Sequence, residues 1–177
     1  GAGAYSLVQS TSNRLDLSVP GKVQLVSGGG GWNNSWRCAA PFQSGIRVEW
    51  TQPAAAQYMV SLGTSATLGE SNPYTNWNYN FYVTSSGQIQ RYLFGSASEV
   101  LATTGTVQPG DRFALDYDGK AIRAYRNGTL IDTYAAIADD LLLYACGAIS
   151  AASGRSEALT ISSAGRVGDA GLNALTV

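Results

Sequence analysis

Two turn-forming dipeptides, Asp118-Gly119 and Asn127-Gly128, divide residues 110–134 into three short segments. Both dipeptides tolerate the positive φ angles of a type I′ turn, and this turn matches the twist of paired antiparallel strands. The stretch therefore predicts a three-stranded antiparallel meander with a two-residue loop at each turn.

The register set by these two loops gives the meander one apolar face. Leu115 lies opposite Ile122, and Ala124 lies opposite Phe113 on one neighbouring strand and Ile131 on the other. Directly opposed side chains on one face of a sheet stabilise it. We therefore expect this face to cover a hydrophobic core.

The other face of the meander combines charged and aromatic side chains. In the same register Arg123 lies directly opposite Asp132, with Asp116 diagonal to it. Tyr125 lies opposite Leu130. This face is a candidate binding surface, and its members are Asp116, Arg123, Tyr125, Leu130, Asp132 and Tyr134. The alternative is a solvated outer face with cross-strand ion pairs, which contribute little to stability.

The composition excludes several classes of function. The chain has 177 residues, a net charge of −1 and only 13% charged residues. A nucleic-acid partner would need a basic stripe, so none is expected. No apolar run is long enough to span a bilayer, so membrane insertion is not expected either.

Short segments of alternating apolar and polar residues recur along the whole chain. They include residues 14–19, 46–50, 57–62, 79–83 and 159–161, each bounded by turn-forming residues. This pattern is typical of an all-β sandwich or barrel. We expect one β-sandwich domain over residues 1–163, followed by a small, polar tail or linker over residues 164–177.

The chain contains no histidine and only two cysteines, Cys38 and Cys146. The absence of histidine removes the usual general base, the commonest zinc ligand and the usual serine or cysteine triads. A catalytic cysteine is not expected, because no imidazole can activate it. The two cysteines either form a disulfide or are buried free thiols, and the sequence leaves both possibilities open.

Two loops, residues 32–36 and 69–80, are rich in aromatic and amide side chains. Flat aromatic rings suit the apolar C–H face of a sugar, and amides suit its hydroxyl groups. The loops predict a carbohydrate site in which the aromatic residues stack and the asparagines hydrogen-bond. The residues are Trp32, Asn34, Trp36, Asn72, Tyr74, Asn76, Trp77, Asn78 and Tyr79. The alternative is that the tryptophans are ordinary core residues or anchor the loops.

The carboxylates favour structural roles over catalysis. A glycosidase needs two carboxyl groups at a fixed separation, and the only acids on alternate strand positions are Asp116 and Asp118. Asp118 occupies a turn, and Asp116 is close to Arg123, so no enzyme and no catalytic residue is predicted. Calcium is the one metal considered, at Asp116, Asp118 and Asn127, although tight turns favour the same residue types.

Three segments together resemble the concanavalin A-like lectin and glucanase superfamily, which includes laminin-G-like and SPRY-like branches. The segments are YMVSLG, YNFYVTSSGQIQRYLFG and VQPGDRFALDYDGKAIRAYRNGTLI, and the resemblance covers roughly residues 45–150. In that superfamily a Gly-Asp element opens a strand, an Asp-Gly turn follows, and the next strand ends in Asn-Gly. Here these are Gly110-Asp111, Asp118-Gly119 and Asn127-Gly128.

The resemblance implies a two-sheet antiparallel jelly roll that binds carbohydrate or protein at its loops or on its concave face. The glucanase carboxylate motif and the metal ligands of legume lectins, including a histidine, are absent from the sequence. We therefore expect a non-catalytic, lectin-like module for cell-surface glycans without a cofactor. The polar, Gly-, Ala- and Thr-rich composition without histidine also resembles that of receptor-binding domains of phage tails. Host recognition at an extracellular or virion surface is therefore expected.

Two alternatives from other functional classes remain. The first is a structural module that assembles homo-oligomers, such as trimers, of a tail fibre or surface protein; the Ala- and Gly-rich C-terminal tail motivates it. The second is a glycan hydrolase or lyase that would use acids such as Asp116 and Glu49. Weak single sites would in any case favour several copies acting together.

Overall fold

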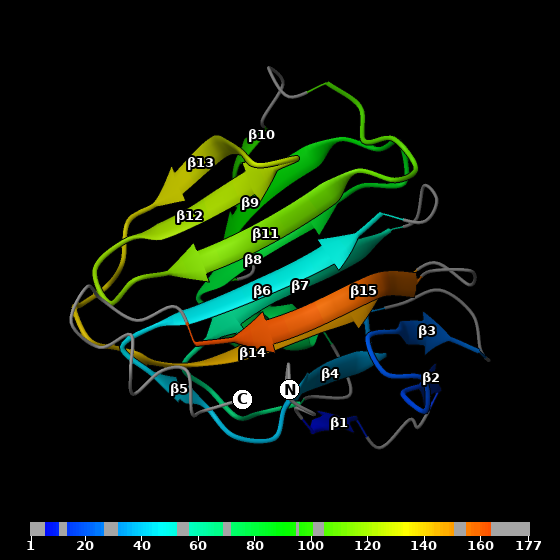
Figure 1. Cartoon of the computed structure of the whole chain (residues 1–177), viewed down its shortest axis with the longest axis horizontal. Helices are drawn as coiled ribbons and strands as arrows, with labels where there is room; N and C mark the ends of the chain where they lie inside the picture. The colour runs from blue at the N-terminus through cyan, green and yellow to red at the C-terminus, as the bar shows by residue number, and fades with distance from the viewer. Residues whose placement is uncertain are drawn as a thin grey trace.

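In the computed structural model of the chain, two antiparallel β-sheets stack face to face (Figure 1). The structure describes residues 6–10, 14–26, 32–52, 57–68, 72–94, 96–100, 105–150 and 155–163, with the backbone alone for 96–100 and 155–158. The predicted all-β, two-sheet antiparallel sandwich is confirmed. The expected tail, residues 164–177, lies outside the described residues, so its role in assembly stays a prediction.

The first sheet has eight strands and lies behind the second in the view of Figure 1. Its order is β1 (Leu7–Gln9), β4 (Ser35–Cys38), β14 (Leu142–Ile149), β7 (Tyr58–Gly63), β8 (Tyr79–Val83), β9 (Ile89–Leu93) and β10 (Ser96–Val100), with β5 (Phe42–Gln43) paired to β14. One short 3₁₀ helix, η1 (Pro73–Asn76), precedes β8. Within the described part of the chain, no helix has the length and apolar character needed to cross a membrane.

The second sheet has seven strands and carries the candidate site. Its order is β13 (Thr129–Tyr134), β12 (Ile122–Arg126), β11 (Arg112–Tyr117), β6 (Ile46–Thr51), β15 (Arg155–Ser162), β3 (Val23–Leu25) and β2 (Leu15–Asp16). Its central strands alternate buried and outward-facing residues, as the sequence pattern predicts.

The two sheets pack around a cluster of aromatic side chains. Trp50 of β6 and Phe113 of β11 both meet Phe81 of β8, on the opposite sheet, with ring centroids 5.2 Å apart in each case. The indole N–H of Trp50 donates a hydrogen bond of 2.9 Å to the hydroxyl of Tyr58. These side chains are at most 2% exposed. The core therefore fixes which residues of β6 and β11 point inward, and the alternate residues point out to solvent.

The turn at Asp118-Gly119 differs from the predicted two-residue loop. Tyr117 pairs with Ile122, so residues 118–121 form a four-residue loop. The carboxylate of Asp118 accepts hydrogen bonds of 2.9 Å from the backbone N–H groups of residues 120 and 121. Aspartate commonly closes turns in this way, and here it stabilises the longer loop.

The longer loop changes the partners across β11 and β12 but not the faces of their side chains. The predicted pairs of Leu115 with Ile122 and of Phe113 with Ala124 are wrong. Leu115 instead lies opposite Ala124. Because the shift is two residues, each side chain stays on the face that the sequence predicted.

The turn at Asn127-Gly128 is confirmed as a two-residue loop. Both residues have positive φ angles, 50° and 82°, and Tyr125 pairs with Leu130 as predicted. Beyond this pair the register shifts, because Ile131 is an extra residue in β13. A bulge of this kind re-aims the side chains that follow it.

The bulge turns Asp132 and Tyr134 into the space between the sheets, so their predicted place on the outer face is wrong. Asp132 lies opposite Ala124, not Arg123, and its carboxylate pairs with both Nε and Nη2 of Arg91 in β9. The side chain of Asp132 is 5% exposed. Arg91 also lies 5.5 Å from the ring centroid of Tyr134. An ion pair thus joins the two sheets where the sequence predicted a surface pair.

Both cysteines are buried free thiols, which settles the choice that the sequence left open. Cys38 faces the inter-sheet core, whereas Cys146 faces the other side of the eight-stranded sheet. Burial raises the pKa of the Cys38 thiol to about 11, so the thiol is protonated and unreactive at neutral pH.

We predict that Asp132→Ala destabilises the protein by about 3 kcal/mol, because it leaves the guanidinium of Arg91 buried without its carboxylate. The double variant Arg91→Leu/Asp132→Leu should recover most of this loss, since an apolar pair can replace a buried ion pair at little cost. Urea denaturation measures both effects. Asp139→Ala, which removes an exposed partner of Lys120, is the control. An equal loss in the free energy of unfolding for Asp132→Ala and Asp139→Ala would contradict a stabilising role of the ion pair between Arg91 and Asp132.

Candidate ligand-binding site

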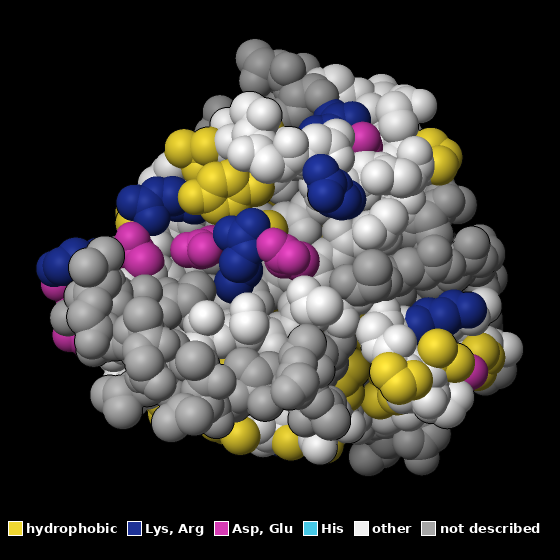
Figure 2. All heavy atoms as spheres, viewed as in Figure 1, with side chains coloured by type: hydrophobic (Ala, Val, Ile, Leu, Met, Phe, Trp, Pro, Cys, Tyr) yellow, Lys and Arg dark blue, Asp and Glu magenta, His cyan; other side chains and the backbone are white. Residues whose placement is uncertain are grey.

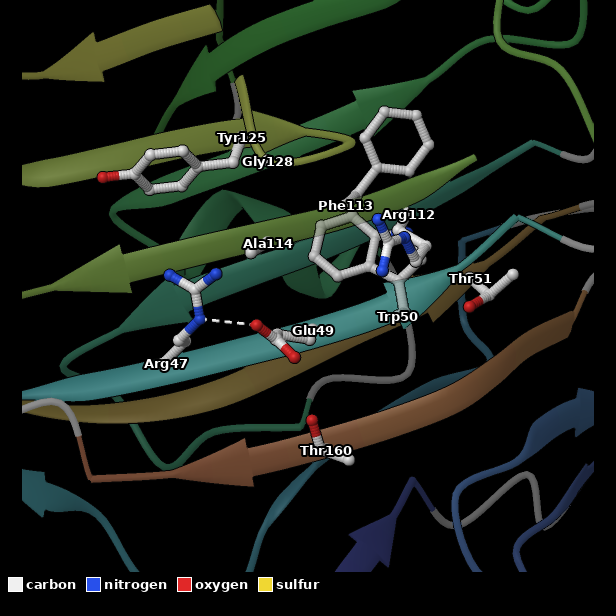
Figure 3. Close-up of a pocket in the computed structure, with 10 residues that line it drawn as sticks. All are labelled: Arg47, Glu49, Trp50, Thr51, Arg112, Phe113, Ala114, Tyr125, Gly128 and Thr160. Carbon is white, nitrogen blue, oxygen red and sulfur yellow. Dashed lines mark hydrogen bonds and ion pairs between the residues drawn. The ribbon is translucent and has the colours of Figure 1, made fainter. Parts of the chain in front are cut away.

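A hollow of about 260 Å³ lies on the outer face of the seven-stranded sheet (Figure 3). Ala114 of β11 forms its floor, because it lies opposite Glu49 of β6 on one side and Tyr125 of β12 on the other. A methyl group between two long side chains leaves empty space above it. The hollow is therefore a consequence of one small residue at the centre of three paired strands.

The walls of the hollow combine polar and apolar surface. The outward side chains that line it are Arg47, Glu49, Thr51, Arg112, Tyr125 and Thr160. Strand pairing places Thr51 opposite Arg112, and Thr160 opposite Glu49. The site thus combines hydroxyl groups, guanidinium groups, a carboxylate and one aromatic ring, supplied by four neighbouring strands.

Arg47 connects the acids of the site. Its Nε donates to Oε1 of Glu49 at 2.6 Å, and its Nη1 donates to Oδ2 of Asp116 at 3.0 Å. The guanidinium carbon also lies 5.3 Å from the ring centroid of Tyr125, within cation–π range. These contacts hold Arg47, Glu49 and Tyr125 in fixed positions at the edge of the hollow, as Figure 3 shows.

Burial and the charge of the partner shift the pKa values of Arg47 and Asp116 in opposite directions. For Arg47, burial lowers the pKa, but the hydrogen bonds and charges of Glu49 and Asp116 outweigh it and raise the pKa above its ordinary value. For Asp116, burial raises the pKa above 3.8, and the hydrogen bond and charge of Arg47 offset only part of the shift.

A second ion pair lies beside the hollow. Nη1 of Arg123 donates to Oδ2 of Asp118 at 2.8 Å. Burial tends to raise the pKa of Asp118, but the backbone N–H groups of residues 120 and 121 and the guanidinium of Arg123 lower it to about 2. Figure 2 shows the resulting row of neighbouring basic and acidic side chains across this face, with an apolar patch next to it.

The second candidate face of the sequence analysis contributes part of this site. Asp116, Arg123 and Tyr125 lie on it, whereas Asp132 does not. Arg47, Thr51, Arg112 and Thr160 were not predicted. Alternation in residues 46–50 already separated Arg47 and Glu49 from the apolar face, but no signal in the sequence indicated that β6 pairs with β11.

The predicted loop site is mostly not accessible. Trp36 and Tyr79 belong to the core between the sheets, and each is 1% exposed. Trp77 is fully buried on the other face of the eight-stranded sheet, against Cys146 and Ala148. These three rings pack as structural residues, so their predicted role as exposed stacking platforms is wrong.

Two of the predicted asparagines are structural as well. Asn34 is fully buried, and its Nδ2 donates to the carbonyl of Ile149 at 3.4 Å. Asn78 is 1% exposed, and its Oδ1 accepts from the backbone N–H of Thr64 at 3.0 Å. Both amides therefore tie loops to the ends of strands and are not available to a sugar.

The remaining loop residues do lie together at the surface. Trp32 and Tyr74 are half-buried neighbours with ring centroids 5.7 Å apart, and Asn72 and Asn76 are exposed. Two strand residues that the loop prediction omitted complete the group. We call Trp32, Tyr74, Tyr82 and Tyr92 the aromatic cluster; its rings meet edge to face on the outer side of the eight-stranded sheet.

The oxygen set considered for calcium is dispersed. Asp118 and Asn127 lie at opposite ends of β12. Asp118 accepts hydrogen bonds within its own turn, whereas Asn127 accepts one from the backbone N–H of Arg112. Asp116 is paired with Arg47. These three residues therefore do not form one cluster, and their side chains serve turns and an ion pair, which is the reading that the sequence favoured. Among the residues that the structure describes, no group of three or more acidic, histidine or cysteine side chains is placed to hold a metal ion.

No protein-family model matches the sequence, and no curated protein is detectably similar to it. Solved structures match the fold over most of the chain. The PSpry domain of TRIM65 has a TM-score of 0.62 at 17% identity, covering 88% of this chain and 90% of its own. The carbohydrate recognition domain of Emp46p in its potassium-bound form has a TM-score of 0.56 at 12% identity, covering 91% of this chain and 88% of its own.

The Ca²⁺-bound exoplasmic/lumenal domain of VIP36 has a TM-score of 0.55 at 7% identity, covering 89% of this chain and 82% of its own. At such identities the likeness shows the fold alone. The fold is the concanavalin A-like jelly roll of lectin and SPRY domains, which the sequence predicted.

We predict that Asp116 and Asp118 titrate on opposite sides of 3.8 although they lie two residues apart. Because the pKa of Asp118 is lowered, its contribution to stability is present above pH 3.8 and is lost as the pH falls through about 2. The raised pKa of Asp116 has the opposite effect, since stability is lost as the pH rises through it. NMR titration of the carboxyl carbons measures both pKa values.

Arg47→Gln should raise the pKa of Asp116 further, because the hydrogen bond and charge of Arg47 are the main influences that lower it. The control is Arg14→Gln, which leaves Arg47 and both carboxyl groups in place. A pKa of Asp116 that is unchanged in Arg47→Gln would contradict the ion pair.

Proposed function

We propose that this concanavalin A-like domain is a non-catalytic carbohydrate-binding module, and that a glycan binds in the hollow over Ala114. The observation that carries the proposal is the composition of the hollow. Hydroxyl and charged groups on four strands surround a space of about 260 Å³ next to the ring of Tyr125. A sugar needs such a set, because its hydroxyl rim requires donors and acceptors and its C–H face requires an apolar surface.

The neighbourhood of Tyr125 supplies the apolar surface. Leu130 lies directly opposite Tyr125 in β13 and is 49% exposed. Arg47 holds the tyrosine ring from the other side. The ring is therefore preorganised before a ligand arrives, which reduces the entropy lost on binding.

The pairing of the acids favours binding over hydrolysis. Glu49 and Asp116 are both bound to Arg47, one through Nε and one through Nη1. A glycosidase needs one carboxyl group that donates a proton and another that attacks or activates water. Two carboxylates that share one guanidinium are better suited to accept hydrogen bonds from hydroxyl groups, so we propose that the domain is not an enzyme.

The fold supports this function but does not specify the ligand. The Emp46p domain of the same fold is a carbohydrate recognition domain. We propose that the glycan recognised here lies on a cell surface and that the domain acts outside the cell, as part of a secreted protein, an adhesin or a phage tail that recognises its host. Several copies acting together would compensate for weak single sites.

We predict that Ala114→Leu weakens glycan binding by about tenfold or more, because the added carbons fill the floor of the hollow. Tyr125→Ala should weaken binding as well, through loss of the ring. Binding to a broad glycan array, followed by calorimetry on the best ligands, measures both effects. Thermal denaturation verifies that each variant is folded.

Ala135→Leu makes the same substitution at an exposed position away from the hollow and serves as the matched control. A third variant, Tyr74→Ala, tests the aromatic cluster on the opposite face. The proposal fails if no glycan binds the wild-type protein. It also fails if Tyr74→Ala abolishes binding while Ala114→Leu leaves it intact.

A further inference from the structure

Arg112 differs from Arg47 and Arg123, which lie on the same outer face of the seven-stranded sheet. Arg47 and Arg123 each form an ion pair with a carboxylate of the same sheet or the loop beside it. Among the described residues, Arg112 has no such partner, although it lines the hollow. Within the part of the chain whose side chains the structure describes, the hollow therefore contains one guanidinium that no carboxylate neutralises.

The backbone around Arg112 is held in place. Its N–H donates to Oδ1 of Asn127 at 2.8 Å, and Nδ2 of Asn127 donates to Oδ1 of Asp111 at 3.0 Å. Oδ2 of Asp111 in turn accepts from Nε of Arg126 at 3.0 Å. The turn after β12 and the start of β11 are thus one network, and the guanidinium of Arg112 extends from a fixed backbone position.

The distribution of charge along β6 gives the hollow two different ends. Strand pairing places Arg112 opposite Thr51, and Ala114 opposite Glu49. Thr51 and Glu49 are two residues apart in one strand, so the ends are separated by about 7 Å along the strand. One end offers the guanidinium of Arg112 and a hydroxyl group, and the other offers a carboxylate that accepts hydrogen bonds.

A guanidinium binds a planar carboxylate through two parallel hydrogen bonds. We propose that the hollow selects an acidic sugar, a hexuronate residue within a glycan, and that Arg112 pairs with its carboxylate. The hydroxyl of Thr51 lies beside that carboxylate, and Glu49 accepts hydrogen bonds from the ring hydroxyls at the far end. This inference rests on the proposed glycan-binding function and names the class of sugar for the same site.

A sulfated sugar carries the same charge in a different shape. Its ester is tetrahedral; a guanidinium can also bind such an anion through two hydrogen bonds, but the oxygens take different positions beside Thr51 from those of a carboxylate. The charge alone is also supplied by lysine, which lacks the bidentate geometry. Ligands that differ in the acidic group, together with Arg112→Lys, therefore separate carboxylate recognition from general attraction of anions.

The experiment compares matched ligands on the full chain by calorimetry at about 0.15 M salt, where long-range charge effects are screened. The probes are oligomers of galacturonate, mannuronate and glucuronate, the carboxyl-reduced form of each, and a sulfated galactan oligomer. The variants are Arg112→Gln and Arg112→Lys. Lys120→Gln is the matched control, because it removes one positive charge at an exposed position away from the hollow.

We expect at least one uronate oligomer to bind the wild-type protein about tenfold more tightly than its reduced form, equivalent to about 1.4 kcal/mol. Arg112→Gln should abolish this preference, Arg112→Lys should retain only part of it, and Lys120→Gln should leave it unchanged.

Two outcomes overturn the inference while glycan binding stands. One is equal affinity for acidic and reduced oligomers, unchanged in Arg112→Gln. In the other, the sulfated oligomer binds as tightly as the uronate oligomer, and Arg112→Lys binds the uronate oligomer as tightly as the wild-type protein does. This result would show general attraction of anions. Failure of every oligosaccharide to bind the wild-type protein, on this panel and on the glycan array, would overturn both proposals.

Discussion

The register between β6 and β11 is the constraint on which the candidate site depends. Inside the sandwich, Trp50 lies opposite Phe113 in the aromatic core, so neither strand can slip without moving a large ring. Outside, the same register places Ala114 opposite Glu49. A slip of one residue would exchange the two faces. The hydrophobic effect that closes the sandwich thus also determines which polar groups surround the hollow.

Much of the fold could be predicted from the sequence, because alternation of apolar and polar residues reports directly on strands with one buried face. The Asn127-Gly128 turn was predictable for the same local reason, since both residues tolerate positive φ. The Asp118-Gly119 loop was not. Its length depends on the carboxylate of Asp118, which stabilises four residues where the dipeptide alone suggests two. The bulge at Ile131 depends on Arg91 of the opposite sheet, which no local pattern reveals.

The site was harder to predict than the fold, because it depends on pairing between distant segments. In the predicted register Ala114 would lie opposite Arg123, and Tyr125 would lie opposite Arg112. The observed register brings Tyr125 and Glu49 to either side of Ala114. Most tryptophans and tyrosines of the predicted loop site proved to be packing residues. Composition alone cannot distinguish a ring that stacks on a ligand from one that seals a core.

Methyl NMR of the alanine-labelled protein tests the central claim most directly, because alanines report on both outer faces. Ala114 forms the floor of the hollow, and Ala148 lies beneath the aromatic cluster on the opposite sheet. On titration with a glycan that binds, the account predicts a large shift of the Ala114 methyl signal and none at Ala148. A shift at Ala148 with an unmoved Ala114 signal would place the ligand on the other sheet and contradict the account.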